Sequence, residues 1–233
     1  MFFRFSTNKC MTDLVKEIKA EGMLKTKRIE DAFISVDRND FLPSTNKTII
    51  YADNAFSLGY GATISAPHMH AHVLDLLEPV LKPGNKCLDI GSGSGILCTL
   101  MMKLVGPNGK VIGVEHISKL VEQSITNIKK YFKKEYEQGI IKIIEGDGRS
   151  GYKAEAPYDC IHVGAAMDSL DDQLLKQLNK NGIMIAPVKS EDGYGYQDLT
   201  VIKKDSEGKI TKEKVTAVMF VPLISKNKQI SMP

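Results

Sequence analysis

Three carboxylates stand at the ends of apolar runs that are typical of buried β-strands. Glu115 is the last residue of its run, and Asp89 is the last but one of its own. Asp147 follows the end of its run after one glycine. The carboxyl ends of parallel strands meet at one edge of a sheet, where open α/β sheets bind ligands. We therefore expect the three acids to face one ligand and to accept hydrogen bonds from its ammonium, hydroxyl or amino groups.

A glycine-rich turn follows the first of these acids, in the pattern D-x-G-x-G-x-G. Its glycines alternate along the chain: Gly91, Gly93 and Gly95. Glycine suits a sharp turn from strand to helix near a ligand, because a Cβ atom would clash in both roles. A dinucleotide-binding turn, G-x-G-x-x-G, would need glycine at position 96, which is Ile96. The spacing instead resembles the cofactor loop of class I S-adenosylmethionine-dependent methyltransferases.

This resemblance assigns a part of S-adenosylmethionine to each acid. Asp89 would meet the ammonium group of the amino acid moiety. Glu115 stands 20 residues past the last loop glycine, where an acid at the end of the second strand accepts hydrogen bonds from both ribose hydroxyls. Asp147 would sit beside the adenine amino group. Glu115 or Asp147 alone could be a solvated loop acid, but three acids at successive strand ends favour a shared site.

A second motif lies before this region, at residues 51–54 and 59–71, and it contains the string ATISAPHMHA. It closely resembles the protein-L-isoaspartate (D-aspartate) O-methyltransferases, in which such a segment contributes the active-site serine, here Ser65. The resemblance covers nearly the whole chain, including residues 156–166 and 221–223. It implies a repair enzyme that methylates the free carboxylate of isoaspartyl residues in damaged proteins and peptides, with D-aspartyl residues as a second substrate class. S-adenosyl-L-homocysteine would be the second product.

The same resemblance implies a set of site residues. Ser65 would be the catalytic residue. Substrate would be bound by Asp53, Thr63, Ser65, His68 and Val221. The cofactor would be bound by Ala62, Thr63, Ile64, Ser65, His70, Asp89, Gly91, Ser92, Gly93, Gly95, Glu115, His116, Asp147 and Gly148.

The chemistry of methyl transfer agrees with these side chains. A carboxylate with a pKa of about 4 is already ionised at neutral pH, so attack on a sulfonium methyl group needs no general base. Holding the reacting oxygen in line can contribute about 7–11 kcal/mol in favourable cases. Hydroxyls of Thr63 and Ser65 could hold one carboxylate oxygen and leave the other free. Read locally, Ser65 could equally be a helix-capping residue before Pro67.

Histidines alternate at positions 68, 70 and 72. On a helix His68 and His72 would share a face as an i, i+4 pair, but no third metal ligand is evident, and we expect no metal. The resemblance places His70 near the cofactor. His162, inside an apolar run, is predicted to be a satisfied core residue.

Composition narrows the class of protein. The 233 residues carry a net charge of +3, from 31 basic and 28 acidic side chains, without the bias typical of nucleic-acid binding. The densest basic run, residues 129–134, suits a solvated helix end. The four cysteines form no C-x-x-C pair and no run is long enough to cross a membrane. We expect a cytoplasmic monomer with reduced thiols that binds neither nucleic acid nor membrane.

The elements predicted around these motifs form one α/β domain. Residues 1–83 hold extra helices (12–21, 28–36 and 67–81) and a long functional loop (38–63). Residues 84–224 form the cofactor-binding core, a doubly wound, Rossmann-like and mostly parallel sheet. Its last two strands, 197–203 and 214–223, would pair as an antiparallel hairpin. Residues 225–233 would be a polar tail.

The sequence departs from the family pattern in three places. Glu115 stands where Asp is common, residues 167–170 replace a loop that often holds proline, and Ile224 replaces a hydroxyl residue. Two other functions are compatible with a cofactor loop of this kind. A related methyltransferase acting on RNA would need a basic, aromatic strip beside the site, which is absent from the sequence. A noncatalytic binding module would be expected to lack Ser65 or Glu115, and both are present.

Overall fold

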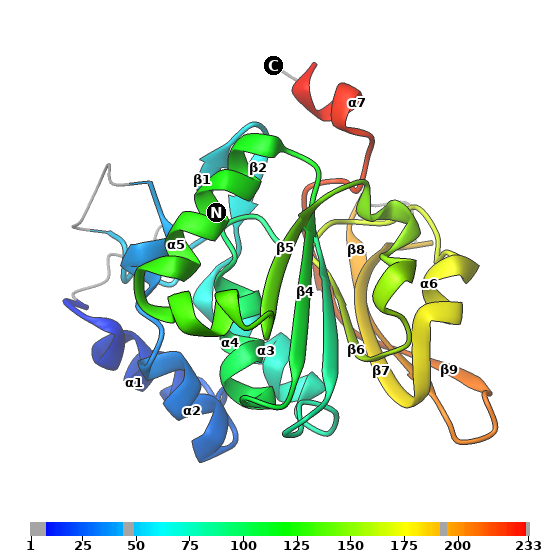
Figure 1. Cartoon of the computed structure of the whole chain (residues 1–233), viewed down its shortest axis with the longest axis horizontal. Coiled ribbons are helices and arrows are strands. Elements are labelled where there is room, and N and C mark those ends of the chain that lie inside the picture. Colours follow the sequence, from blue (N-terminus) through cyan, green and yellow to red (C-terminus); the bar gives the residue numbers. More distant parts are fainter. Residues whose placement is uncertain (1–7, 44–48, 192–194, 232–233) are drawn as a thin grey trace.

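The computed structural model describes residues 8–43, 49–191 and 195–231. A seven-stranded sheet runs through its centre (Figure 1). In spatial order the strands are β5 (Ile141–Glu145), β4 (Lys110–Glu115), β3 (Lys86–Ile90), β6 (Tyr158–Val163), β7 (Leu178–Lys189), β8 (Gln197–Lys204) and β9 (Ile210–Val218). The first five are parallel, and β8 and β9 are antiparallel to their neighbours. The predicted fold, including the terminal hairpin, is confirmed.

Helices cover both faces of this sheet unequally. One face carries the helices on the left of Figure 1. They are α1 (Met11–Ala20), α2 (Lys27–Ile34), α3 (Pro67–Leu77), α4 (Ile96–Val105) and α5 (Ser118–Glu137). The short helix α6 (Asp172–Gln177) lies against the other face. No helix in the described ranges is long and apolar enough to cross a membrane.

The strand sequences explain why the sheet is buried on both sides. Successive residues of a strand point to opposite faces. Cys87 and Val111 belong to the core under α1–α5, whereas their neighbours Leu88 and Ile112 belong to the core under α6. Parallel strands buried on both faces read as continuous apolar runs, which is how these runs appear in the sequence.

The register of the sheet places polar groups together at its carboxyl edge. Asp89 of β3 lies beside Gly113 of β4 on one side and beside His162 of β6 on the other. Glu115 ends β4 opposite Glu145 of β5. Asp147 follows the end of β5 after one glycine, so the three predicted acids all lie at the carboxyl ends of neighbouring strands.

The segment predicted as a loop from 38 to 63 contains regular structure. A 3-10 helix spans Arg38–Phe41, and a small antiparallel hairpin joins β1 (Phe56–Gly59) to β2 (Ala62–Ile64). Tyr60 has φ of 55° in its turn, between two glycines that also have positive φ. In such a short, glycine-rich hairpin the strands have too few residues to show an alternation of apolar and polar side chains, so the sequence does not predict them. Residues 44–48 of this loop lie outside the described ranges.

The end of the chain differs from the prediction in two ways. Strand β9 ends at Val218 instead of continuing to 223. Beyond it the chain crosses the sheet edge, where Ala166 N donates to Val221 O and Leu223 N donates to Ala166 O. Pro222, which has no N–H, lies between them. Part of the expected polar tail then forms helix α7 (Lys226–Ile230).

Candidate active site

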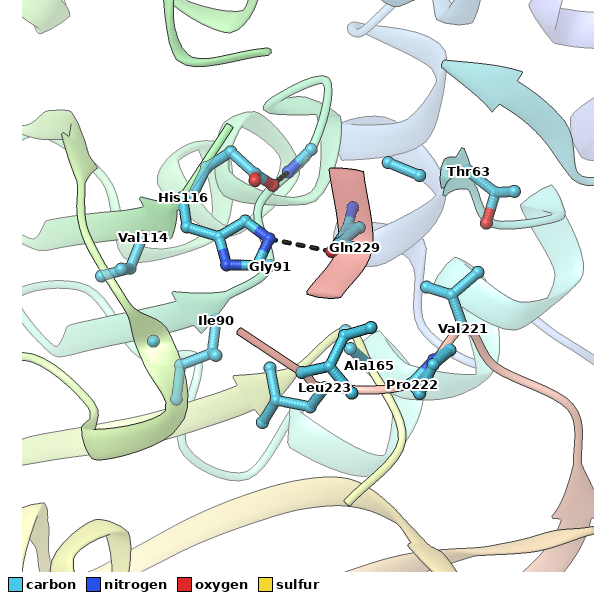
Figure 2. A pocket seen from close by; sticks show the side chains of 16 residues that line it. Thr63, Ile90, Gly91, Val114, His116, Ala165, Val221, Pro222, Leu223 and Gln229 are labelled. Carbon is cyan, nitrogen blue, oxygen red and sulfur yellow. Dashed lines mark hydrogen bonds between the residues drawn. The ribbon is translucent and has the colours of Figure 1, made fainter. Parts of the chain in front are cut away.

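Three neighbouring cavities with shared walls lie at the carboxyl edge of the sheet. The Glu115 cavity, drawn in Figure 2, is lined among others by Thr63, Gly93, Glu115, His116, Gly148 and Gln229. The Asp89 cavity is lined among others by Thr63, Ser65, His70, Asp89, Ser92 and His162. The Asp53 cavity is lined among others by Asp53, Thr63, Ser65, His68, Met69 and Met219. Thr63 belongs to all three, and Ser65 belongs to the second and third.

The glycine turn between β3 and α4 separates the first two cavities. Gly91, Gly93 and Gly95 have φ of 74°, 50° and 84°, a conformation that L side chains rarely adopt. A Cβ atom on Gly93 would also lie 3.2 Å from Leu58 Cδ1. The turn therefore needs glycine for its path as well as for access to a ligand.

Glu115 holds this turn in place. Its Oε2 accepts a hydrogen bond from Gly93 N at 3.1 Å, and its Oε1 accepts one from Ile117 N at 2.9 Å. The residue is only 6% exposed, yet it lines the Glu115 cavity. A carboxylate oxygen has two lone-pair positions. Each oxygen can therefore still accept a hydrogen bond from a hydroxyl group in the cavity.

Asp89 is the centre of a buried polar cluster. His162 Nδ1 donates to its Oδ1 at 2.7 Å, and Cys98 Sγ donates to its Oδ2 at 3.1 Å. Burial is the main reason why the pKa of Cys98 is raised well above its usual value, and the nearby carboxylate of Asp89 adds to the effect. The hydroxyl of Ser92, also in this cavity, is buried and has no hydrogen-bond partner in the described chain. The cavity thus presents an unused hydroxyl next to a carboxylate.

His70 adds an uncharged ring to the same cavity. Burial, reinforced by Arg38 and His162, lowers its pKa well below the usual value. The ring is therefore neutral at physiological pH. Asp89 supplies the negative charge of this cavity.

Asp53 fixes the start of α3. Its Oδ1 accepts from His68 N and its Oδ2 lies 2.8 Å from His68 Nδ1, so it caps the helix and holds the ring. Burial tends to raise the pKa of Asp53, but the hydrogen bonds from His68 outweigh it and the net pKa is lowered. His68 is thereby paired with Asp53 and not with His72.

Comparisons with known proteins point to one family over nearly the whole chain. The family model described as protein-L-isoaspartate(D-aspartate) O-methyltransferase (PCMT) matches residues 8–228. The chain belongs to this family. The protein-L-isoaspartate O-methyltransferase of Caenorhabditis elegans is 44% identical, with 96% of this chain and 95% of that protein covered. Protein-L-isoaspartate O-methyltransferase 1 of Arabidopsis thaliana is 41% identical, with 93% and 92% covered.

A solved structure extends the comparison to the cofactor. The crystal structure of a beta-aspartate methyltransferase (PCMT) from Plasmodium falciparum, in complex with S-adenosyl-L-homocysteine, is 32% identical. It has a TM-score of 0.84, with 93% of this chain and 99% of that chain covered. The predictions of an O-methyltransferase and of S-adenosylmethionine as its methyl donor are confirmed.

Most of the predicted site residues meet at these cavities. Ala62, Gly91, Gly93, Glu115, His116 and Gly148 line the Glu115 cavity, and Ile64, His70, Asp89 and Ser92 line the Asp89 cavity. The acceptors of Glu115, the unpartnered hydroxyl of Ser92 and the carboxylate of Asp89 fit a ligand that carries hydroxyl groups and a positive charge. Asp53 and His68 line the third cavity.

Three predicted residues do not lie in the cavity that their predicted role requires. Gly95 lines none of the three cavities and is the N-cap of α4. Asp147 also lines none of them, and its carboxylate is paired with Arg149, which lowers the pKa of Asp147. Val221 lines the Glu115 cavity, not the Asp53 cavity assigned to substrate. Their roles in binding stay predictions.

Sequence reasoning missed three residues at the site. Gln229 of α7 contacts His116 Nε2 at 2.8 Å and donates to Tyr60 O, and it closes one side of the Glu115 cavity (Figure 2). His162, predicted as a core residue, is buried but also lines the Asp89 cavity. Arg38 is buried against Ser65. The family-like Val-Pro-Leu segment at residues 221–223 was the available signal that the chain end approaches the site.

Among the described residues, no group of three or more His, Cys, Asp or Glu side chains is arranged to hold a metal ion.

Proposed function

We propose that this protein transfers the methyl group of S-adenosylmethionine to the free carboxylate of L-isoaspartyl residues in damaged proteins and peptides, and that D-aspartyl residues are further substrates. The observation that carries the proposal is the position of Thr63 and Ser65. Thr63 is in β2 and Ser65 directly follows this strand, and both residues line the Asp89 cavity and the Asp53 cavity. Two hydroxyl-bearing residues therefore separate the methyl donor from an open pocket.

The residues of the chain supply orientation and do not supply a base. A carboxylate oxygen forms the new bond to the methyl carbon, the sulfur–methyl bond breaks, and S-adenosylhomocysteine leaves with the bonding electrons. The carboxylate is ionised at neutral pH, so no proton moves before this step. Ser65 and Thr63 would donate hydrogen bonds to one carboxylate oxygen and keep the other in line with the methyl group.

Each cofactor-side residue has a matching task. Glu115 would accept hydrogen bonds from the ribose hydroxyls, and Asp89 would attract the ammonium group. S-adenosylmethionine supplies the electrophilic methyl group when bound. Because the Glu115 cavity and the Asp89 cavity share Thr63 and the glycine turn, one extended ligand can occupy both.

A methylation assay with matched peptides tests the function. Peptides of identical sequence that contain L-isoaspartyl, D-aspartyl or L-aspartyl at one position are incubated with labelled cofactor, together with an RNA sample. We expect labelling of the isoaspartyl peptide and no labelling of the L-aspartyl peptide. The product should be a base-labile ester. Equal labelling of both peptides, or labelling of RNA, would contradict the proposal and favour a different methyltransferase activity.

We also propose that the protein acts as a monomer in the cytoplasm. Three of its four cysteines, Cys87, Cys98 and Cys160, are free and buried, which supports a reducing compartment. Light scattering coupled to size exclusion should give one chain mass across a dilution series. A stable dimer, or an exported protein in cell fractionation, would contradict this.

A further inference from the structure

The Asp53 cavity has no cation of its own for an anionic substrate. Among its lining residues in the described chain, the ionisable side chains are Asp53 and His68, and none is lysine or arginine. Asp53 is itself negative and lies 8% exposed beside His68. A carboxylate placed in this cavity would meet the negative charge of Asp53, so a cation close to the wall would favour its binding.

Arg38 lies directly behind that wall. It is 1% exposed, and its guanidinium group donates from Nη1 to Ser65 O and from Nη2 to Asn54 O, each at 2.9 Å. Ser65 and Asn54 both line the Asp53 cavity. The group also lies 5.7 Å from the centre of the Phe56 ring in β1. One cation therefore connects segments of the cavity wall that are distant in sequence.

The charge of Arg38 is not cancelled by an ion pair. No carboxylate of the described residues lies within ion-pair distance of it, and its Nε is buried without a hydrogen-bond partner. Burial lowers the pKa of Arg38 to about 9, with the field of Asp53 acting in the other direction. The group thus remains a cation at neutral pH. An unpaired buried charge costs folding free energy, and an apolar side chain of similar volume would often serve the fold as well.

We propose that Arg38 is a positioning residue for the substrate carboxylate, acting through the main chain of Ser65. The fork of its guanidinium holds Ser65 against Asn54, and its charge compensates the substrate carboxylate across the Ser65 peptide unit without touching it. This inference rests on the proposed function. It explains how a cavity without exposed cations selects an anionic group.

The test compares ligands that differ only in charge. Binding of an isoaspartyl peptide is measured against the same peptide with isoasparagine, whose amide is neutral, in the presence of S-adenosylhomocysteine. In the Arg38→Met variant we expect the preference for the carboxylate to fall by about tenfold or more, since the attraction acts in a partly buried site. The affinity for S-adenosylhomocysteine alone should stay close to that of the parent. Arg38→Lys should restore part of the preference, because it returns the charge without the two-pronged grip.

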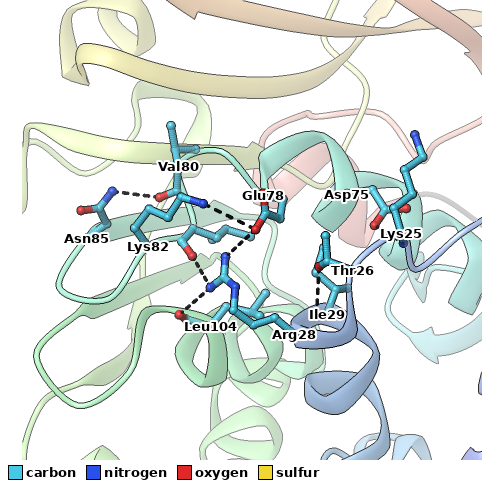
Figure 3. Close-up of polar contacts among 11 residues, drawn as sticks. Lys25, Thr26, Arg28, Ile29, Asp75, Glu78, Val80, Lys82, Asn85 and Leu104 are labelled. Atoms are coloured by element: carbon cyan, nitrogen blue, oxygen red, sulfur yellow. Dashed lines mark hydrogen bonds and ion pairs between the residues drawn. The ribbon is translucent and has the colours of Figure 1, made fainter.

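Arg28 provides a matched control. It also clamps two carbonyl groups, donating from Nη1 to Leu81 O and Leu104 O, and it pairs with Glu78 (Figure 3). It connects α2 to residues at the ends of α3 and α4 and lines none of the three cavities. Arg28→Met should therefore lower stability without changing the preference between the two peptides.

Several outcomes would overturn the proposal. An unchanged preference in a folded Arg38→Met variant would show that the charge is not used, and the same loss in Arg28→Met would reduce it to a general structural effect. If His68→Gln, and not Arg38→Met, abolishes the preference, then His68 supplies the cation. A parent protein that does not methylate the isoaspartyl peptide would instead contradict the proposed function.

Discussion

Asp89 and His162 lie side by side on β3 and β6, and the ring Nδ1 of His162 donates a 2.7 Å hydrogen bond to Asp89 Oδ1. Both side chains line the cavity that also holds the unpartnered hydroxyl of Ser92. An ionised carboxylate can only accept in this bond, so Nδ1 of His162 carries the proton. The hydrogen bond holds the carboxylate of Asp89 in the cavity wall, where its negative charge suits an ammonium group.

Replacing Asp89 by Asn should weaken cofactor binding. The amide removes the negative charge of this cavity, and charge-assisted hydrogen bonds are worth about 1.5–3 kcal/mol, so the affinity should fall about tenfold or more. Calorimetric titration with S-adenosylhomocysteine measures this. Cys98→Ala, which removes only the thiol that donates to Asp89, serves as the control and should change the affinity little. Unchanged affinity in Asp89→Asn would assign the ammonium group to another residue.

Replacing Glu115 by Ala should weaken cofactor binding by about tenfold or more, because two hydroxyl contacts to a carboxylate are lost. The substitution also removes the acceptors for Gly93 N and Ile117 N, so the glycine turn should become more mobile. Calorimetry gives the affinity, and thermal melting gives the stability. Glu122→Ala, at an exposed site on α5, should affect neither. A folded variant with parental affinity would mean that another acid holds the ribose.

Ser65 should act as an orienting donor and not as a nucleophile. Ser65→Ala should lower kcat for the isoaspartyl peptide by about 100-fold, since small misplacements of the reacting oxygen cost that much. Cofactor affinity should stay nearly unchanged, and Ser65→Thr should retain part of the activity. Ser206→Ala, in the turn between β8 and β9, is the control. Mass spectrometry that finds Ser65 covalently modified during turnover would disprove this role.

Asp53 should stabilise the fold in a pH-dependent way. Its pKa is lowered in the folded protein, so it contributes stability that is present above its unfolded pKa of about 3.9 and is lost as the pH falls through the folded value. Asp53→Asn should therefore be less stable than the parent at neutral pH. The gap in free energy of unfolding, measured by urea denaturation, should narrow below about pH 4. A gap that stays constant into acid would show that the charge is not responsible.

Gly113→Ala should destabilise the protein and disturb the glycine turn. The added Cβ would lie 2.7 Å from Ile143 Cδ1, 2.8 Å from Cys98 Sγ and 2.9 Å from Ser92 Cβ. Overpacking of this kind typically costs about 1–3 kcal/mol. Gly146→Ala is the matched control, because its nearest contact would be an ordinary 3.8 Å. Equal urea midpoints for the two variants would contradict the expected strain.

Features encoded locally could be predicted from the sequence. The apolar run that ends at Glu115 predicts a buried strand, and β4 confirms it, because a buried parallel strand is one unbroken apolar run. The glycine turn could also be predicted, because its positive φ angles favour one residue type, glycine. Such signals need no knowledge of distant parts of the chain.

Features that depend on long-range contacts could not be predicted. Arg38 and Gln229 reach the site through hydrogen bonds to Ser65 and His116, 27 and 113 residues away in sequence. Neither residue type is unusual in its local context, so no pattern distinguishes it from a solvated surface residue. His162 is buried and hydrogen-bonded, as predicted, but its place in the cavity wall depends on contacts between strands that the sequence does not show.

The shared position of Thr63 has a thermodynamic consequence. Since Thr63 lines all three cavities of the site, a molecule bound on one side of it completes the surface that receives the other. The two binding free energies are therefore linked, and linkage is reciprocal: whatever factor the methyl donor adds to peptide affinity, the peptide must add to the affinity for the donor. We therefore expect any cooperativity between the two substrates to depend on Thr63, the residue that both binding surfaces share.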